Sequence, residues 1–149
     1  MTTPDRPWWQ LVLEGRADER EMPPPRFVRE LGIEPAGWEP GVARLRWKPP
    51  AWTRVPLGWV QGGILGVPLD MAQSFAIVTL APEWAGAVTL DMRLTYLEPA
   101  YPDEYLVEGR VTRMGKTAAH TEGTVTDMDG RVICTSVSAA LVKTYGPRP

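Results

Sequence analysis

The segment GWVQGGILGVPLDMAQSFAIVTLA, residues 58–81, is the longest apolar stretch of the chain, and its only ionisable side chain is Asp70. The stretch is long enough to cross a membrane. Pro68, Gln73 and Ser74 interrupt it, however, and an aspartate near the centre of a spanning helix is strongly disfavoured. The stretch therefore predicts a helix that is buried on most of its circumference within a folded domain. Because burial of an unpaired carboxylate is costly, Asp70 is a candidate functional residue.

Strand patterns lie on both sides of this helix, which is expected over residues 62–80. Before the helix, one strand is expected within residues 29–38 and another within residues 41–50, where Pro-Pro ends it. Four strands are expected after it, in AVTLDMRLTYLEPA, EYLVEGRVTRM, AAHTEGTVTD and RVICTSVSAALV, the last two joined by an Asp-Gly turn. This order predicts an α+β hotdog fold, in which a curved antiparallel sheet of about six strands wraps around one long central helix.

The first of the four later strands has a regular period of two. Its apolar residues are Val88, Leu90, Met92, Leu94 and Tyr96, and they alternate with polar residues. The pattern predicts a single apolar face, with Thr89 and Asp91 together on the opposite face. Asp91 is expected to make a polar contact at a subunit interface.

The N-terminal part of the chain differs in composition from the rest. Proline and tryptophan are concentrated before residue 60. PWWQLVLEGR predicts a short helix over residues 8–16, and MPPPR predicts an extended linker because each proline restricts itself and its predecessor. We therefore expect residues 1–26 to be an N-terminal helix and proline-rich linker, and residues 27–149 to be a single domain.

Composition excludes several classes of protein. A net charge of −2 and no polybasic stretch argue against nucleic-acid or anionic-membrane binding. The single cysteine, Cys134, cannot form an intrachain disulfide, and the chain begins without a basic and apolar leader, so a cytoplasmic location is expected. The lone His120 has no metal-ligand spacing around it, so we expect no metal and a structural role for this histidine.

Three features together resemble one known family. They are Gln61-Gly62-Gly63, Asp70 nine residues after Gln61, and TLDMRLTYLEPA over residues 89–100. Over residues 58–142 the chain resembles the PaaI-like hotdog-fold acyl-CoA thioesterases. That family has histidine where this chain has Gln61, which keeps hydrogen bonding but cannot carry charge. Pro68 inside the helix is a second departure, because its missing N–H removes a helical hydrogen bond.

The resemblance implies the hydrolysis of acyl-CoA or aryl-CoA thioesters without a cofactor, since coenzyme A belongs to the substrate. The N–H of Gly62, with Gly63 as second choice, is expected to polarise the carbonyl at the helix N-terminus. Asp70 is expected to act as general base or as nucleophile, and Gln61 to contribute a hydrogen bond. Thr89 matches the family position whose hydroxyl orients the acid or the water.

Six residues are candidates for substrate binding, and each also has a plain structural interpretation. They are Gly63, Gln73, Ser74, Trp59, Arg113 and Lys116. Gln73 and Ser74 follow Asp70 by three and four residues and are expected on its helix face, where either could hold water. Trp59, like the nearby Trp52, could line the acyl slot. Arg113 and Lys116 flank a turn that, as the resemblance implies, could contact the phosphates of coenzyme A.

The spacing of the catalytic candidates predicts an active site shared between two chains. Gly62 and Asp70 lie eight residues apart on one expected helix, or about 12 Å, too far to act on one carbonyl. A homodimer, or a dimer of dimers, with antiparallel helices would bring them together, as the resemblance also implies. Two alternatives remain: a hotdog protein that binds acyl-CoA without hydrolysing it, and a hotdog dehydratase, which the absence of a catalytic histidine disfavours.

Overall fold

The computed structural model describes residues 7–20, 22–82 and 85–145. Its strands and main helix follow the expected order. They are β1 (Ile33–Glu39), β2 (Val42–Trp47), α3 (Gly62–Val78), β3 (Ala85–Tyr96), β4 (Tyr105–Met114), β5 (Ala118–Asp127) and β6 (Val132–Thr144). Shorter helical turns are α1 (Trp8–Leu13), η2 (Ala17–Arg20), α2 (Arg26–Glu30) and η3 (Ala51–Thr53).

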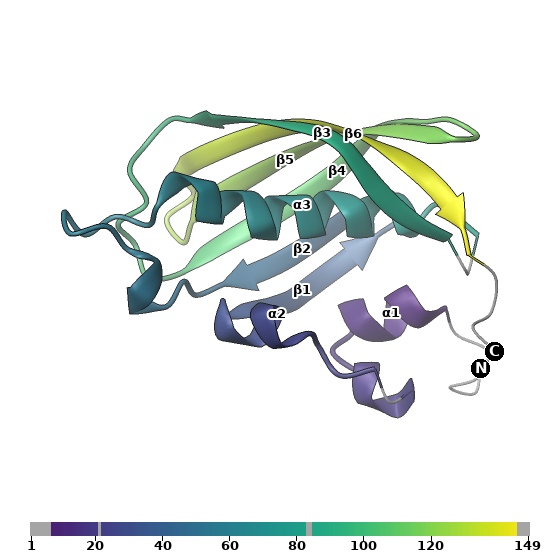
Figure 1. Ribbon diagram of the computed structural model, residues 1–149, viewed down its shortest axis with the longest axis horizontal. Helices are drawn as coiled ribbons and strands as arrows, with labels where there is room; N and C mark the ends of the chain where they lie inside the picture. The colour runs from purple at the N-terminus through teal and green to yellow at the C-terminus, as the bar shows by residue number, and fades with distance from the viewer. Residues whose placement is uncertain (1–6, 21, 83–84, 146–149) are drawn as a thin grey trace.

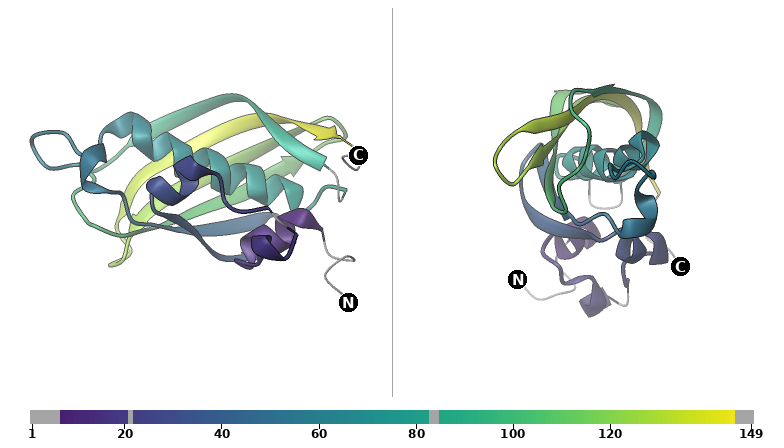
Figure 2. Two further views of the ribbon diagram at one scale, coloured as in Figure 1. Left: turned by 60° about the horizontal axis from the view of Figure 1, so that its bottom comes forward. Right: turned by 90° about the vertical axis from the view of Figure 1, so that its left-hand side faces the viewer.

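The six strands form one antiparallel sheet in the order β1-β2-β4-β5-β6-β3. The sheet curves around α3, and Figures 1 and 2 show the helix lying along its concave side. This confirms the predicted architecture of about six strands around one long helix. β1 and β3 are the two edge strands, so β3 is paired on one side only, with β6.

Two glycines let the helix sit directly on the middle of the sheet. Gly109 of β4 and Gly123 of β5 are register partners. A Cβ on Gly109 would lie 2.3 Å from the backbone carbonyl carbon of Ala72, and one on Gly123 would lie 2.9 Å from the Leu69 side chain. The buried face of α3 is therefore held at close range to β4 and β5.

The N-terminal segment, residues 7–30, packs across the side of α3 that the sheet does not cover (Figure 2). Buried Trp9 packs edge-on against Trp38 of β1, with ring centroids 4.9 Å apart, and Leu11 and Leu13 are also buried. α1 ends at Leu13, earlier than predicted, and the short helix α2 after the prolines was not predicted. The proposed boundary at residue 26 remains a prediction, and residues 1–6 lie outside the described chain.

Strand β3 contains a bulge that corrects the predicted face pattern. Thr89 pairs with Ala140 and Asp91 pairs with the next residue back, Ala139, so Leu90 has no partner of its own. Before the bulge the odd-numbered positions face α3, and after it the even-numbered positions do. The single apolar face was therefore wrong: Leu90 is 58% exposed, while Met92 and Leu94 pack against the core. Thr89 and Asp91 lie on opposite faces.

Candidate active site

The first turn of α3 has free backbone donors. Gln61 is the N-cap residue and its side chain makes no capping hydrogen bond. The leading N–H groups of Gly62 and Gly63 have no acceptor within a helix, and we find none for them elsewhere in the described chain. The Tyr96 hydroxyl donates to the Gly62 carbonyl oxygen at 2.9 Å, and a Cβ on Gly62 would meet the Tyr96 ring at 3.2 Å. Glycine therefore keeps this end of the helix open to a ligand.

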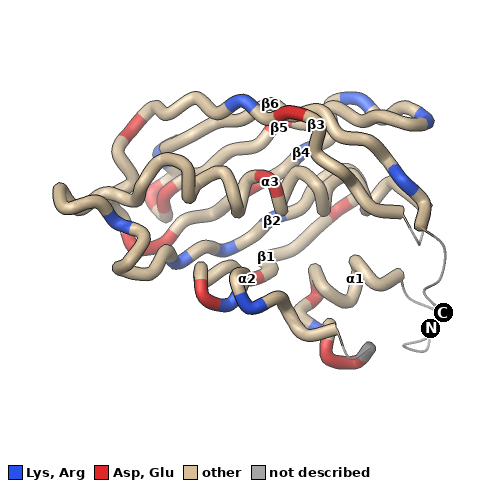
Figure 3. The backbone as a smooth tube through the Cα atoms, in the orientation of Figure 1, with Lys and Arg blue, Asp and Glu red and all other residues tan. Residues whose placement is uncertain are grey.

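Asp70 is the only charged residue of α3 and lies near the middle of its span, Gly62–Val78; in Figure 3 the rest of α3 carries no charge colour. The Thr89 hydroxyl of β3 donates to Asp70 Oδ1 at 2.5 Å. This contact exists because the bulge at Leu90 turns Thr89 toward the helix. A hydrogen bond of this kind favours the charged carboxylate and fixes its direction.

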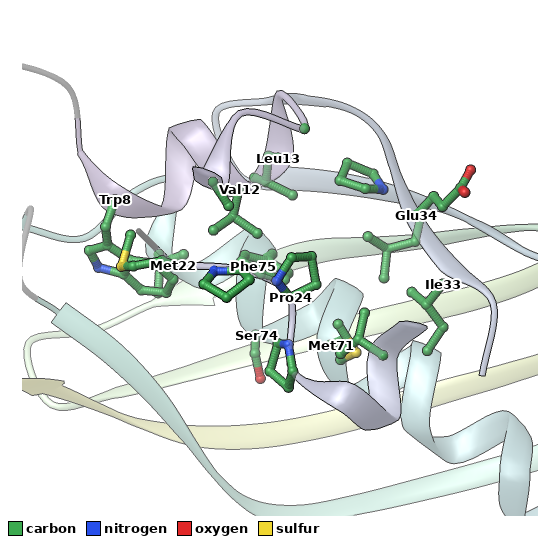
Figure 4. A pocket seen from close by; sticks show the side chains of 18 of the residues that line it. Trp8, Val12, Leu13, Met22, Pro24, Ile33, Glu34, Met71, Ser74 and Phe75 are labelled. Atoms are coloured by element: carbon green, nitrogen blue, oxygen red, sulfur yellow. The ribbon is translucent and has the colours of Figure 1, made fainter. Parts of the chain in front are cut away.

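A cavity of about 550 Å³ lies beside Asp70. Asp70, Met71, Ser74 and Phe75 of α3 form its inner wall, and residues of the N-terminal segment form its outer wall (Figure 4). Most of the lining is apolar. The cavity is large enough for a small organic ligand. Asp70 therefore lies at the boundary of a mostly apolar cavity.

A second cavity of about 320 Å³ lies at the N-terminus of α3. Gly62, Trp59 and Tyr96 line it, together with residues 97–100. Trp59 packs edge-on against Tyr101 with ring centroids 5.8 Å apart. Arg54 secures the surrounding loops, since its guanidinium donates to the carbonyl oxygens of residues 58, 101 and 102 at 2.8–2.9 Å. Trp59 thus lies beside the first residue of α3 and does not line the cavity beside Asp70, so its role in substrate binding stays a prediction.

Gln73 and Ser74 do not share one environment, contrary to the expectation that both lie on the face of Asp70. Gln73 is 2% exposed and points into the sheet. Its Nε2 donates to Ser136 Oγ at 2.9 Å, and its Oε1 accepts from the Thr121 hydroxyl at 3.0 Å. Through these hydrogen bonds Gln73 joins α3 to strands β5 and β6. Of these two residues, only Ser74 lines the cavity beside Asp70.

The remaining candidates lie away from both cavities. Arg113 and Lys116 are exposed at the β4–β5 turn, and neither lines a described cavity. His120 is exposed on β5 and pairs with Arg113 in the register. Cys134 is buried, and burial raises the pKa of its thiol to about 11, so this thiol is a poor nucleophile at neutral pH.

The described residues contain no group of three or more His, Cys, Asp or Glu side chains that could hold a metal ion. Among these same residues, no helix is long and apolar enough to span a membrane.

Two parts of the site were missed by sequence reasoning. The first is Tyr96, whose hydroxyl donates a hydrogen bond to Gly62, the first residue of α3. Tyr96 belongs to the motif TLDMRLTYLEPA, so the motif could have indicated it. The N-terminal segment was expected only as a helix and a linker, yet it supplies the outer wall of the cavity beside Asp70. No local pattern signals that wall, because it depends on how the segment packs on α3.

Similar proteins support the architecture and identify the family. The relative named "Putative esterase SSO2140" from Saccharolobus solfataricus is 31% identical over 75 residues, which are 50% of this chain and 53% of that protein. The chain thus matches about half the length of this curated relative. A phenylacetic acid degradation-related protein from Ralstonia eutropha JMP134 is 25% identical, with 90% of this chain and 98% of that chain covered and a TM-score of 0.76.

The structure of smu.793 from Streptococcus mutans UA159, bound to acetyl-CoA, shares the fold at 19% identity. The structural match covers 73% of this chain and 86% of the Streptococcus mutans chain, with a TM-score of 0.67. The family model of the thioesterase superfamily matches residues 57–134, which include α3, Asp70 and the β3 bulge. With its sheet wrapped around α3 in the hotdog arrangement, the chain belongs to the thioesterase superfamily.

Proposed function

We propose that this protein hydrolyses acyl-CoA thioesters, with Asp70 as the catalytic carboxylate. The observation that carries the proposal is the position of Asp70. Its carboxylate accepts a hydrogen bond from Thr89, the residue lines a mostly apolar cavity, and the N-terminus of its helix presents free backbone N–H groups. A base, an oxyanion donor and an acyl site are what thioester hydrolysis requires.

In this reaction Asp70 takes a proton from a water molecule whose oxygen attacks the thioester carbonyl carbon. The carbonyl oxygen becomes negative and accepts a hydrogen bond from the Gly62 N–H, with the positive end of α3 behind it. The tetrahedral intermediate then collapses, the C–S bond breaks, and the thiol of coenzyme A leaves with the proton. Direct attack by Asp70 would form an anhydride instead. Thr89 keeps the carboxylate aimed in either route.

We further propose that each site is formed by two chains. α3 runs from Gly62 to Val78 without a break, so Gly62 and Asp70 are about 12 Å apart along it. One carbonyl cannot contact both residues of the same chain. A two-fold partner with an antiparallel α3 would place its Asp70 opposite this Gly62.

Strand β3 supports this association. It is a long edge strand, and its exposed residues include apolar Val88 and Leu90. An unpaired edge with exposed apolar side chains favours pairing with another strand. We therefore assign the homodimer contact to β3, with a dimer of dimers as the larger assembly.

Coenzyme A thioesters are the proposed substrate class because the structurally similar Streptococcus mutans protein was solved with acetyl-CoA. The route uses no cofactor beyond the substrate. The single buried Cys134 suits a reducing compartment, and we assign the reaction to the cytoplasm.

The test is a panel of acyl-CoAs with release of free thiol as the readout. We expect turnover by the wild type, and a loss of about 100-fold or more for Asp70→Asn with unchanged thermal unfolding. Asp129→Asn is the matched control, because it makes the same substitution at an exposed turn residue that lines neither cavity. Tight binding of acyl-CoA without turnover would overturn the proposal in favour of a binding protein. Near-full activity of Asp70→Asn would remove Asp70 from the mechanism.

A further inference from the structure

The outer wall of the cavity beside Asp70 comes from the N-terminal segment rather than from the sheet. Trp8, Val12 and Leu13 of α1 contribute to it, as do residues 22–25 and Phe27 of α2 (Figure 4). The opposite wall is α3, and residues 33–35 and 86–87 also line the cavity. Residues far apart in the chain therefore enclose one space.

This wall is part of the folded structure and not a loose extension. Leu11 and Leu13 are 0% and 2% exposed, and Trp9 is 6% exposed against Trp38 of β1. Trp8 also contacts Phe75 of α3, with ring centroids 6.3 Å apart. Helix α1 is thus anchored to both β1 and α3, so the side chains that it directs into the cavity have defined positions.

The chemistry of the lining determines what fits inside. No lysine or arginine lines the cavity among the described residues, so nothing there matches a phosphate or a carboxylate. Its acidic residues are Asp18, Glu34 and Asp70, which would repel an anion. Of these, Asp70 is the proposed catalytic group. The lining therefore suits an uncharged apolar group, and the position of Asp70 requires that this group be attached to the thioester carbonyl carbon.

We infer that this cavity binds the acyl group of the substrate, and that the N-terminal segment selects thioesters with large, uncharged, apolar acyl groups. The inference rests on the proposed function and extends it to the substrate class. The nucleotide part of coenzyme A remains outside, because the apolar lining offers it no partner. A volume of about 550 Å³ leaves an acetyl group surrounded by water, whereas an octanoyl group displaces that water.

The wild-type enzyme should therefore prefer octanoyl-CoA over butyryl-CoA and acetyl-CoA. Each methylene buried in the cavity raises kcat/KM by up to about fourfold. Succinyl-CoA has the same number of acyl carbons as butyryl-CoA but ends in a carboxylate. It should be the poorer substrate of this pair, because the lining contains acidic and no basic side chains.

Val12→Trp tests the wall directly. Val12 is half-buried on α1 and lines the cavity, so an indole there fills space that a long acyl chain needs. We expect the ratio of kcat/KM for octanoyl-CoA to that for acetyl-CoA to fall by about tenfold or more. Gln10→Trp is the matched control, because Gln10 lies on the same helix and does not line the cavity. Its ratio should remain at the wild-type value.

A second variant keeps the test valid if Val12→Trp does not fold. Phe27→Ala removes a side chain that lines the cavity and is 51% exposed, so its removal should not disturb the core. We expect a rise of about fivefold in KM for octanoyl-CoA. Arg29→Ala on the same short helix is the control, since Arg29 does not line the cavity.

Binding of a non-hydrolysable thioether analogue of octanoyl-CoA, measured by calorimetry, separates this inference from the proposed function. Suppose that no thioester is hydrolysed, that the octanoyl analogue binds more tightly than the acetyl analogue, and that Val12→Trp abolishes this difference. The acyl-binding cavity is then supported and the proposed hydrolysis is refuted. If hydrolysis occurs but the octanoyl preference is absent, or is unchanged in Val12→Trp and Phe27→Ala, the assignment of the wall is wrong.

Discussion

Replacement of Gly62 by proline removes the proposed oxyanion donor with little disturbance of the helix. Gly62 is the first residue of α3, a position where proline is favoured because that N–H has no helical acceptor. Gln61 has φ −58° and ψ 129°, which lies in the polyproline region that a residue before proline adopts. The backbone on both sides is therefore already compatible with the substitution.

Gly62→Ala is the matched control for this change. Alanine and proline both add a Cβ, which meets the Tyr96 ring at 3.2 Å, so both variants displace that half-exposed ring. Only proline removes the N–H. Loss of one oxyanion donor lowers kcat by about 100- to 1,000-fold, so we expect Gly62→Pro to fall below Gly62→Ala by that factor. KM should change less, because the donor acts mainly on the transition state.

The assay is steady-state release of free thiol from the best acyl-CoA, together with thermal unfolding and native mass spectrometry of both variants. Equal folding and assembly with a large difference in kcat would support the reasoning. A Gly62→Pro variant within about tenfold of Gly62→Ala would refute the assignment of the Gly62 N–H. The same pair of substitutions at Gly63 then tests the second candidate donor.

Three further predictions concern assembly, the N-cap and the contact between helix and sheet. Mixing Asp70→Asn with Gly62→Pro subunits should restore about a quarter of wild-type activity after complete exchange, because each heterodimer regains one intact site; complete exchange without recovery excludes the shared site. Gln61→Ala should lower kcat by about tenfold or less, since a neutral hydrogen bond contributes about 1 kcal/mol; abolished turnover would show that Gln61 is essential. Gly109→Ala should lower the free energy of unfolding in denaturant titrations by about 1–3 kcal/mol, because its Cβ would overlap the α3 backbone at 2.3 Å. Gly66→Ala is its control, since that Cβ meets only the side chains of Met92 and Leu94, at 3.5 and 3.8 Å, and equal stabilities of the two variants would contradict the close contact.

The order of elements and the proposed catalytic residue could be predicted from the sequence because their signals are local. The apolar run over residues 58–81 specifies a buried helix wherever it is placed, and α3 spans Gly62–Val78 within it. The isolated charge of Asp70 and the glycines before it are visible without any partner. Period-two alternation similarly located the strands, since successive side chains of a strand point alternately toward the core and away from it.

The arrangement around Asp70 was decided by tertiary structure. Thr89 faces the carboxylate only because β3 bulges at Leu90, and that bulge is defined by pairing with Ala139 and Ala140, about fifty residues later in the chain. The rotation of α3 on the sheet sends Gln73 toward β5 and β6 and leaves Ser74 at the cavity. Helical spacing alone places both residues near Asp70 and cannot choose between them.

The amino-acid sequence by itself determined a helix with one carboxylate, glycines at its N-terminus and strands to cover it, because hydrophobic period and backbone freedom belong to short stretches of chain. Only the tertiary structure decided which polar groups meet that carboxylate and what encloses the space beside it. Those contacts join Asp70 to Thr89 of β3 and to the N-terminal segment, which lie far from it in the sequence. They depend on strand register and on packing across α3, and neither is specified by the residues of one element alone.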